Sequence, residues 1–176
     1  MNRRNMMFVT LVGFATFSSI HALYAQDNRA DPVLAEAMED ATISLQQGLT
    51  AAGSKGRPIS AKFEIEDGKL QLSIYTAKGK KFSEVIIDLE TGKVAKSEPI
   101  TEGDDLVAAK AQSGAMAKTK TSLKAVADKA VRKSEGFHAV SVTPALKNGH
   151  GVASVTLLKG NQMKTVEEAL KKKKID

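Results

Sequence analysis

The chain of 176 residues has no cysteine, no tryptophan and only two tyrosines. The absence of cysteine excludes disulfide bonds, a thiolate nucleophile and any cysteine-based metal site. Phe137 is the only aromatic residue in the basic second half of the chain. No platform for stacking bases is therefore present, and we expect no nucleic-acid partner. Core packing must hold the fold together, and a mature chain of about 150 residues is long enough for that.

Long apolar runs are also absent, except at the start of the chain. Arg3 and Arg4 precede a mostly apolar, uncharged stretch, residues 6–20, and Ala25 offers a small residue for cleavage. This layout predicts a secretory signal peptide over residues 1–25, and its apolar stretch is too short to span a bilayer. An uncleaved N-terminal anchor is the alternative. We expect a periplasmic or secreted protein without a transmembrane segment after cleavage.

The chain repeats one pattern of residues. Lys78-Gly79 and the apolar residues after it recur from Lys159-Gly160 onward, and we call the interval from Lys78 to Lys159 the repeat offset. Ser44-Leu45 recurs as Ser122-Leu123 after a slightly shorter interval. A period near 80 is typical of two copies of a small domain. We place the first unit at residues 31–98 and the second at residues 101–174, with a longer loop over residues 144–151 that holds the extra residues of the second copy.

The first unit shows both helical and strand periodicity. Asp31 and Pro32 are typical of a helix start, and apolar residues at steps of three and four predict one helix that ends at Gly53. Alternation then predicts a strand over residues 59–66. Asp67-Gly68 predicts a tight hairpin that pairs Phe63 with Leu72. A third strand over residues 82–89 and a short one over 94–96 follow.

The second unit is predicted from the same signals. An alanine-rich helix spans residues 106–131 with a break at Gly114, and strands follow over residues 137–142 and 152–158. Residues 165–174 have a helical composition, but the repeat assigns residues 163–170 to a strand, and we follow the repeat. The predicted fold class is α+β, with two tandem units that each pack a helix on a small antiparallel β-sheet.

The motifs resemble those of the PepSY domain family. The first unit carries Ile59-x-Ala-x-Phe63-x-Ile-x-Asp-Gly68 and the string Val85-Ile-Ile-Asp-x-x-Thr-Gly-Lys-Val94. The second unit keeps Lys159-Gly160 but lacks the Asp and Thr-Gly of that string. The resemblance implies tandem PepSY-like units in an exported protein, with a role in binding and restraining peptidases. It implies no catalytic residue.

The sequence shows no pattern of a catalytic, cofactor-binding or metal site. His138 and His150 lack the spacing of metal ligands, and we interpret both as surface or edge residues. Asp88 lies beside Glu90 at a strand end, where an aspartate commonly stabilises a turn. A nucleophile motif of the Gly-x-Ser-x-Gly type is absent. We predict that the protein is not an enzyme and needs no cofactor.

Charge is distributed unevenly between the two halves. Residues 26–100 carry 10 basic and 12 acidic side chains, whereas residues 101–176 carry 14 basic and 8 acidic ones. Two hypotheses remain. The first is a non-enzymatic module that binds a protein in the cell envelope, with a peptidase as the partner that the resemblance suggests. The second is a protein held on anionic lipid or polymer by its basic half, including Lys171 to Lys174.

Overall fold

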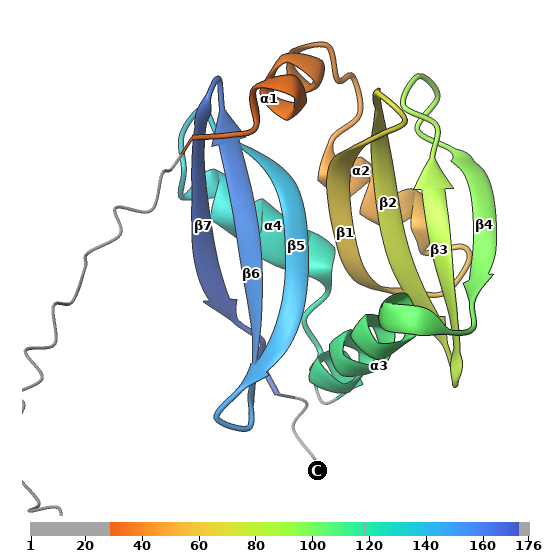
Figure 1. Ribbon diagram of the computed structural model, residues 1–176. Helices are drawn as coiled ribbons and strands as arrows, with labels where there is room; N and C mark the ends of the chain where they lie inside the picture. Colours follow the sequence, from red (N-terminus) through yellow and green to blue (C-terminus); the bar gives the residue numbers. More distant parts are fainter. Residues whose placement is uncertain (1–28, 118, 173–176) are drawn as a thin grey trace, which may run out of the picture.

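The computed structural model describes residues 29–117 and 119–172, which form four helices and seven strands (Figure 1). The predicted signal peptide, residues 1–25, lies outside the described residues. In chain order the elements are α1 (Pro32–Glu39), α2 (Leu45–Ala52), β1 (Arg57–Glu66), β2 (Lys69–Lys78), β3 (Lys81–Ile87), β4 (Val94–Ile100), α3 (Gly103–Ala117), α4 (Leu123–Arg132), β5 (His138–Lys147), β6 (His150–Lys159) and β7 (Gln162–Ala169).

All seven strands belong to one antiparallel sheet, in the order β4-β3-β2-β1-β5-β6-β7. The prediction of two units that each have a helix on a small sheet of their own is therefore wrong. The halves join where β1 pairs with β5, through Ala61 opposite Val142 and Lys62 opposite Ser141. This pairing satisfies backbone groups of two strands that would otherwise be exposed edges. Residue alternation within a strand does not identify such a distant partner, so the sequence left this junction open.

The two halves contain matching hairpins. The predicted register of the first is confirmed, with Phe63 opposite Leu72 and Ile65 opposite Leu70. The second hairpin, β5–β6, has the same strand lengths one repeat offset later, and it turns at Asn148-Gly149. The predicted loop over residues 144–151 is thus wrong. Both turns have positive φ at two successive residues, 49° and 73° in the first and 52° and 73° in the second, as a type I′ turn requires.

The two hairpins also share an irregularity in their first strands, β1 and β5. The pairing register of β1 shifts between Pro58 and Ser60, and that of β5 shifts between Ala139 and Ser141. The residues skipped are Ile59 and Val140, again one repeat offset apart. A bulge bends its strand and increases the local twist, so both halves bend at the same place beside their junction.

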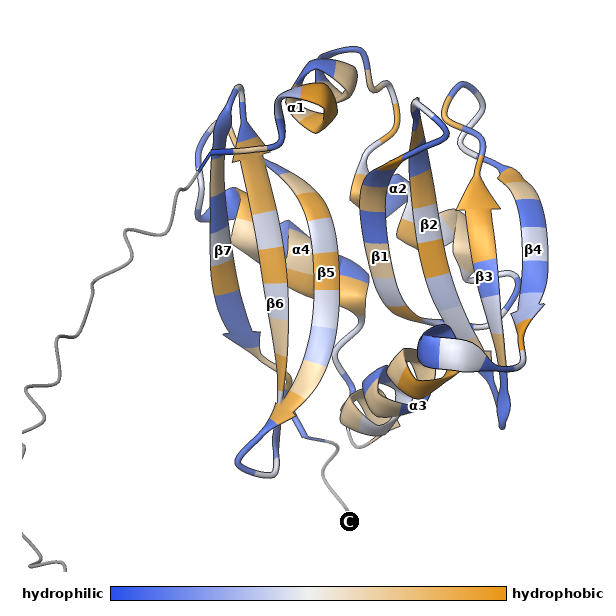
Figure 2. Cartoon of the chain, viewed as in Figure 1, coloured by the Kyte–Doolittle hydropathy of each residue, from blue (hydrophilic) through white to orange (hydrophobic). Residues whose placement is uncertain are grey.

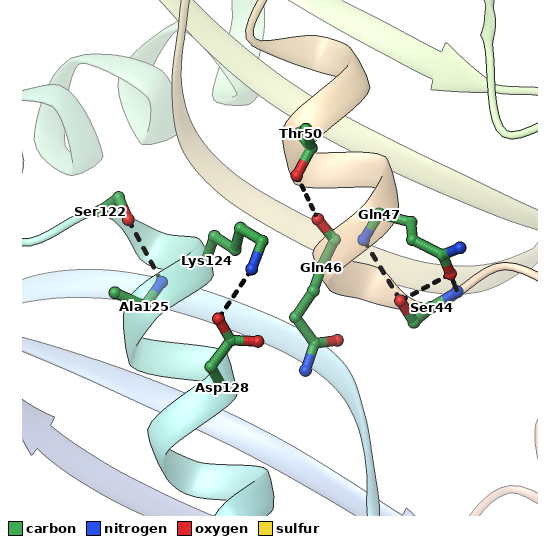
Figure 3. Close-up of polar contacts among 8 residues, drawn as sticks. All are labelled: Ser44, Gln46, Gln47, Thr50, Ser122, Lys124, Ala125 and Asp128. Atoms are coloured by element: carbon green, nitrogen blue, oxygen red, sulfur yellow. Dashed lines mark hydrogen bonds and ion pairs between the residues drawn. The ribbon is translucent and has the colours of Figure 1, made fainter.

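The first predicted helix is two helices in the structure. Asp31 caps α1 as expected, because its carboxylate accepts a hydrogen bond from the Val33 N–H. The helix stops at Glu39, and a new helix begins after Ser44. Ser44 and Gln47 form a capping box (Figure 3), which satisfies backbone donors that a continuous helix would have bonded internally. The capping box at Ser44 therefore starts a second helix inside the stretch that the apolar spacing predicts to be one helix.

The second predicted helix is also divided, but not at Gly114. That glycine lies inside α3, where a Cβ atom would meet nothing within 4 Å. The break falls after Ala117, and α4 begins at the cap residue Ser122, whose hydroxyl accepts a hydrogen bond from the Ala125 N–H (Figure 3). The extra residues of the second copy lie in the longer α4 and in its connection to β5, since α4 spans ten residues and α2 spans eight.

The last predicted strand is confirmed over residues 162–169, where helical composition competed with the repeat. The backbone there pairs with β6 along its full length, from Gln162 opposite Lys159 to Ala169 opposite Val152. The strand predicted over residues 94–96 is longer in the structure and reaches Ile100. It includes Pro99, which lies between the two units predicted from the sequence. An edge strand tolerates proline because one side of it needs no N–H donor.

The hydrophobic core lies between the sheet and the pair α2 and α4, which cover the same face (Figure 1). Phe63, Leu72 and Val155 face these helices and are almost fully buried, as are Leu45 and Leu123 on the helices themselves. In contrast, α3 lies against the opposite face near one end of the strands. Among residues 29–117 and 119–172, no helix is long and apolar enough to cross a bilayer.

Candidate functional site

The face of the sheet opposite α2 and α4 is largely uncovered (Figure 1), and hydrophilic and hydrophobic residues alternate along most of its strands (Figure 2). Successive residues of a strand point to opposite faces, so the residues between the core positions share this surface. One row of them crosses five strands in register: Ser73, Lys62, Ser141, Thr156 and Thr165. We call this surface, with its row of polar side chains, the open face. It spans both halves of the molecule and the junction between them.

A groove of about 310 Å³ is sunk into the open face beside α3. Its floor comes from β1, β2 and β5, and α3 forms one wall. Two side-chain hydrogen bonds fix that wall: the Tyr75 hydroxyl donates to Asp105 Oδ1 at 2.6 Å, and the Ser60 hydroxyl donates to Gln112 Oε1 at 2.9 Å. The groove is therefore held by contacts between segments far apart in the sequence.

Carboxylates dominate the electrostatics at the β2–β4 side of the groove. Burial raises the pKa of the Glu84 carboxyl above its ordinary value; a hydrogen bond with Ser73 opposes this rise, and the nearby charges of Glu64, Asp105 and Glu98 add to it. Burial, followed by the hydrogen bond to Asp105, also raises the pKa of the Tyr75 phenol far above its usual range. The phenol therefore stays protonated as a donor, and the carboxylates repel one another.

Lysines compensate for part of this negative charge. Lys62 Nζ lies 3.1 Å from Glu64 Oε2, and Lys96 Nζ lies 2.9 Å from Glu98 Oε2. Both pairs are exposed to solvent and contribute little to stability. Glu84 and Asp105 are not in an ion pair among the described residues, and Asp105 accepts its hydrogen bond from a neutral phenol. This region thus keeps a net negative charge that a cationic group could neutralise.

A larger hollow, about 570 Å³, lies on the other side of the sheet, between the α1–α2 connection and α4. Several of its polar side chains are already used within the chain. Ser44 and Gln47 form the cap of α2, and Asp128 accepts from Lys124 Nζ at 2.8 Å (Figure 3). Phe63 at its floor is only 1% exposed. We therefore take the open face, not this hollow, as the candidate site.

Of the residues considered for chemistry from the sequence, His138 lines the larger hollow, whereas His150 and Asp88 lie at neither place. His138 and His150 are exposed at the first positions of β5 and β6, at opposite ends of the hairpin and about 30 Å apart at the usual rise per strand residue. Asp88 accepts hydrogen bonds from the N–H groups of Glu90 and Thr91 and from the Thr91 hydroxyl, as the turn interpretation predicts. These bonds lower its pKa, first of all those from Thr91. The described residues contain no group of three or more acids and histidines placed to hold a metal ion.

The basic residues of the second half are partly neutralised by contacts within the chain. Lys129 and Lys133 both donate to Glu168, which is only 8% exposed, and Lys147 pairs with Glu167. The hydrogen bond from Lys129, and after it the one from Lys133, lowers the pKa of the Glu168 carboxyl. The expected basic patch is therefore partly a set of internal ion pairs that fasten α4 to β7.

Part of the open face was visible in the sequence. The predicted pairing of Phe63 with Leu72 implies that Lys62 lies opposite Ser73 and Glu64 opposite Gln71 on the outer face, and this register is confirmed. The contribution of α3 had no such signal, because Asp105 and Gln112 reach the sheet only through the tertiary fold. Comparison with family models, curated proteins and solved structures finds no match to this chain. The resemblance to the PepSY family stays a prediction.

Proposed function

We propose that this protein is an exported, non-enzymatic module that binds a protein partner in the cell envelope through the open face of its sheet. The observation that carries the proposal is the one-sided arrangement of the fold. Helices α2 and α4 cover one face, and the other presents a polar row across five strands with a groove beside it. Small side chains on a broad sheet give a surface on which a partner can pack closely. Export rests on the predicted signal peptide.

The charges around the groove indicate the chemistry of the partner. Glu84 and Asp105 lie where a lysine or arginine side chain of the partner would relieve their mutual repulsion. Complementary charge of this kind raises the association rate and makes it sensitive to salt. We propose that the partner presents a basic, convex segment to the open face. An envelope peptidase is the class that the family resemblance suggests.

The structure gives less support to the alternative, attachment to anionic lipid or polymer. Such binding needs uncompensated lysines on one surface, but Lys124, Lys129 and Lys133 are each paired with a carboxylate. Replacing Lys171 to Lys174 with glutamine tests the alternative directly. If it holds, the replacement weakens binding to anionic vesicles at low salt.

The proposal is tested with matched arginine variants. Thr143 is exposed at the groove, and Ala125 is exposed on α4, on the opposite side of the sheet. Thr143→Arg places a bulky cation on the open face, and Ala125→Arg adds the same group elsewhere. We expect proteins captured from an envelope extract by immobilised residues 26–176 to be reduced at least about tenfold by Thr143→Arg and unchanged by Ala125→Arg. Equal capture by both variants would contradict binding through the open face.

A further inference from the structure

The β5–β6 hairpin ends in an exposed turn in which a glycine follows an asparagine. Asn148 and Gly149 are both exposed, with φ of 52° and 73°. In the view of Figure 1 this turn projects from the lower end of the sheet, away from α1 and α2. A Cβ atom added to Gly149 would meet nothing within 4 Å. Solvent therefore reaches both residues of the turn freely.

The turn also leaves its own polar groups without partners. The last pair of the β5–β6 ladder joins Lys147 with His150, and in a two-residue turn the two flanking residues exchange the closing hydrogen bonds. In the described ranges 29–117 and 119–172, neither the Gly149 N–H nor the Asn148 side chain takes part in a hydrogen bond. A backbone nitrogen and the side-chain amide that precedes it are thus both free to react.

We infer that Asn148 is a site of spontaneous deamidation, which converts this turn slowly and irreversibly. The Gly149 nitrogen loses its proton to solvent and attacks the side-chain carbonyl carbon of Asn148. A new C–N bond closes a five-membered succinimide ring, while the side-chain nitrogen takes up a proton and leaves as ammonia. Water then opens the ring at either carbonyl and gives aspartate or isoaspartate. The net reaction exchanges one water for one ammonia and needs no oxidant, reductant or cofactor.

Two other turns of the molecule show why this position is selected. Asn148 is the only asparagine of the sequence that precedes a glycine, and glycine has no Cβ to obstruct the attack. Asn161 is also exposed in a hairpin turn, but it is followed by Gln162, whose backbone pairs with Lys159. Asp67 precedes a glycine in the first hairpin, but its side chain is a carboxylate at neutral pH, which repels the attacking nitrogen.

The first half indicates how the two products behave. Asp67 has φ of 49° in a turn of the same kind, so aspartate at position 148 fits without rearrangement. Isoaspartate carries the main chain through its side-chain Cβ and adds one backbone atom to the turn, whose length sets the register of the hairpin. The change lies beside Gly151, whose carbonyl accepts the Leu170 N–H at 2.9 Å. The isoaspartate form therefore loosens the chain where it leaves β7.

The inference goes beyond the proposed function and does not depend on it, because neither residue of the turn lines the groove. Its test follows each asparagine by peptide mass in the folded mature chain, residues 26–176, during storage in mildly alkaline buffer. We expect the peptide with Asn148 to gain one dalton at least about tenfold faster than the peptide with Asn161, which corresponds to a barrier lower by about 1.4 kcal/mol. The gain should be faster at higher pH, because the attacking nitrogen must lose its proton.

Two variants isolate the chemistry and its consequence. Gly149→Ala places a methyl group beside the attacking nitrogen and should slow the gain at least about tenfold. Asn148→Asp should show no gain, and its Leu170 amide should exchange with solvent as slowly as in the fresh wild type. In the aged chain that contains isoaspartate, the same amide should exchange faster, because local opening exposes it. The comparison of Asn148 with Asn161 uses only the wild type and holds if Gly149→Ala fails to fold.

Four outcomes would overturn the inference. The first is a folded wild-type chain without any gain of mass at Asn148, and the second is an equal gain at Asn148 and Asn161. The third is a folded Gly149→Ala variant that gains mass as fast as the wild type. The fourth is a Leu170 amide that exchanges alike in the aged chain and in Asn148→Asp, which would contradict the loss of register in the isoaspartate form.

Discussion

The two halves of the molecule share their backbone and differ in what surrounds it. Hairpins, bulges and positive-φ turns recur at the repeat offset, in the same registers. The helix contacts, the outer edges and the charges do not recur. Backbone hydrogen bonds and the φ angles that the turns require therefore determine what the halves share. The packing partners and the surface side chains differ between them. The two halves therefore differ where their residues contact a helix, form an outer edge of the sheet or face solvent.

The largest expected effect concerns the packing of each helix on its hairpin. Gly48 of α2 lies against Leu72 and Ile74, and a Cβ there would clash with Leu72. The matching positions of the second half hold Val126 and Ala153, so the large and small partners are exchanged. Gly48→Val should lower the free energy of unfolding in urea by about 2–3 kcal/mol, the usual cost of overpacking.

Adding Leu72→Ala to Gly48→Val imitates the second half and sharpens this comparison. The double variant should lose about 1–2 kcal/mol less than the sum of the single losses, because neighbouring substitutions couple. Gly114→Val is the control, since a Cβ at that position meets nothing within 4 Å. Strict additivity of the two substitutions would show that the halves do not share this packing.

The next effect concerns the two hairpin turns, which should respond alike. Gly68 and Gly149 both have φ of 73° and space for a Cβ atom. Alanine at either position is strained in the left-handed region by about 1–2 kcal/mol. We expect Gly68→Ala and Gly149→Ala to lower the free energy of unfolding equally, within about 0.5 kcal/mol, the usual scatter of such pairs. A clear inequality would mean that the second turn is held differently from the first.

A smaller difference is expected between the helix caps. Ser44 belongs to a capping box, but the position matching Gln47 is Ala125, so Ser122 has only half of that arrangement. Ser44→Ala should cost about 1 kcal/mol, and Ser122→Ala nearer to about 0.5 kcal/mol, by thermal unfolding. In a Gln47→Ala background, Ser44→Ala should cost only as much stability as Ser122→Ala does in the wild type. Equal costs in the unmodified background would count against a role for Gln47.

The smallest effect at neutral pH concerns Glu168, which matches the buried Ile87 of the first half. Its folded-state pKa lies below its ordinary value because of Lys129 and Lys133. The stability it contributes is therefore present above the ordinary glutamate pKa and is lost as the pH falls through the folded value. Glu168→Ile restores the residue type of the first half and leaves both lysines in contact with solvent.

We expect Glu168→Ile to change the free energy of unfolding at pH 7 by less than about 1 kcal/mol, as for other replacements of an ion pair by an apolar contact. The destabilisation of the wild type on acidification below its ordinary glutamate pKa should become weaker in this variant. Urea unfolding at several pH values between neutral and acidic measures both effects. An unchanged pH dependence would show that Glu168 is not the group responsible.

Local signals predicted the parts of the fold that local physics determines. Asp67-Gly68 fixed the first hairpin because few residue pairs accept two positive φ values. Asn148-Gly149 is the same kind of signal, and it was missed because Pro144 and the polar residues near it suggested a loop. The strand at β7 came from the repeat alone, against its helical composition. Ser44, with Gln47 three residues later, is also a local signal for a helix start within the helical pattern.

Long-range pairing accounts for the rest. No pattern within β1 or β5 indicates that these strands are neighbours, because their pairing is decided by which edges remain after each hairpin has formed. The same holds for α3, whose residues Asp105 and Gln112 become wall residues of the groove only when the helix crosses the sheet. The outer polar face of the first hairpin was predictable, and the groove on it was not.

The junction at Ala61 and Val142 has one further consequence. Shifting Ala61 by the repeat offset gives Val142, its own pairing partner. A residue that faces its own equivalent lies on a two-fold axis, and an interface built around such an axis is isologous. The junction thus has the geometry of the interface in a symmetric dimer, although both halves belong to one chain. Within one chain the two halves need not be identical, so each can have its own edge and charge while the shared junction holds them together.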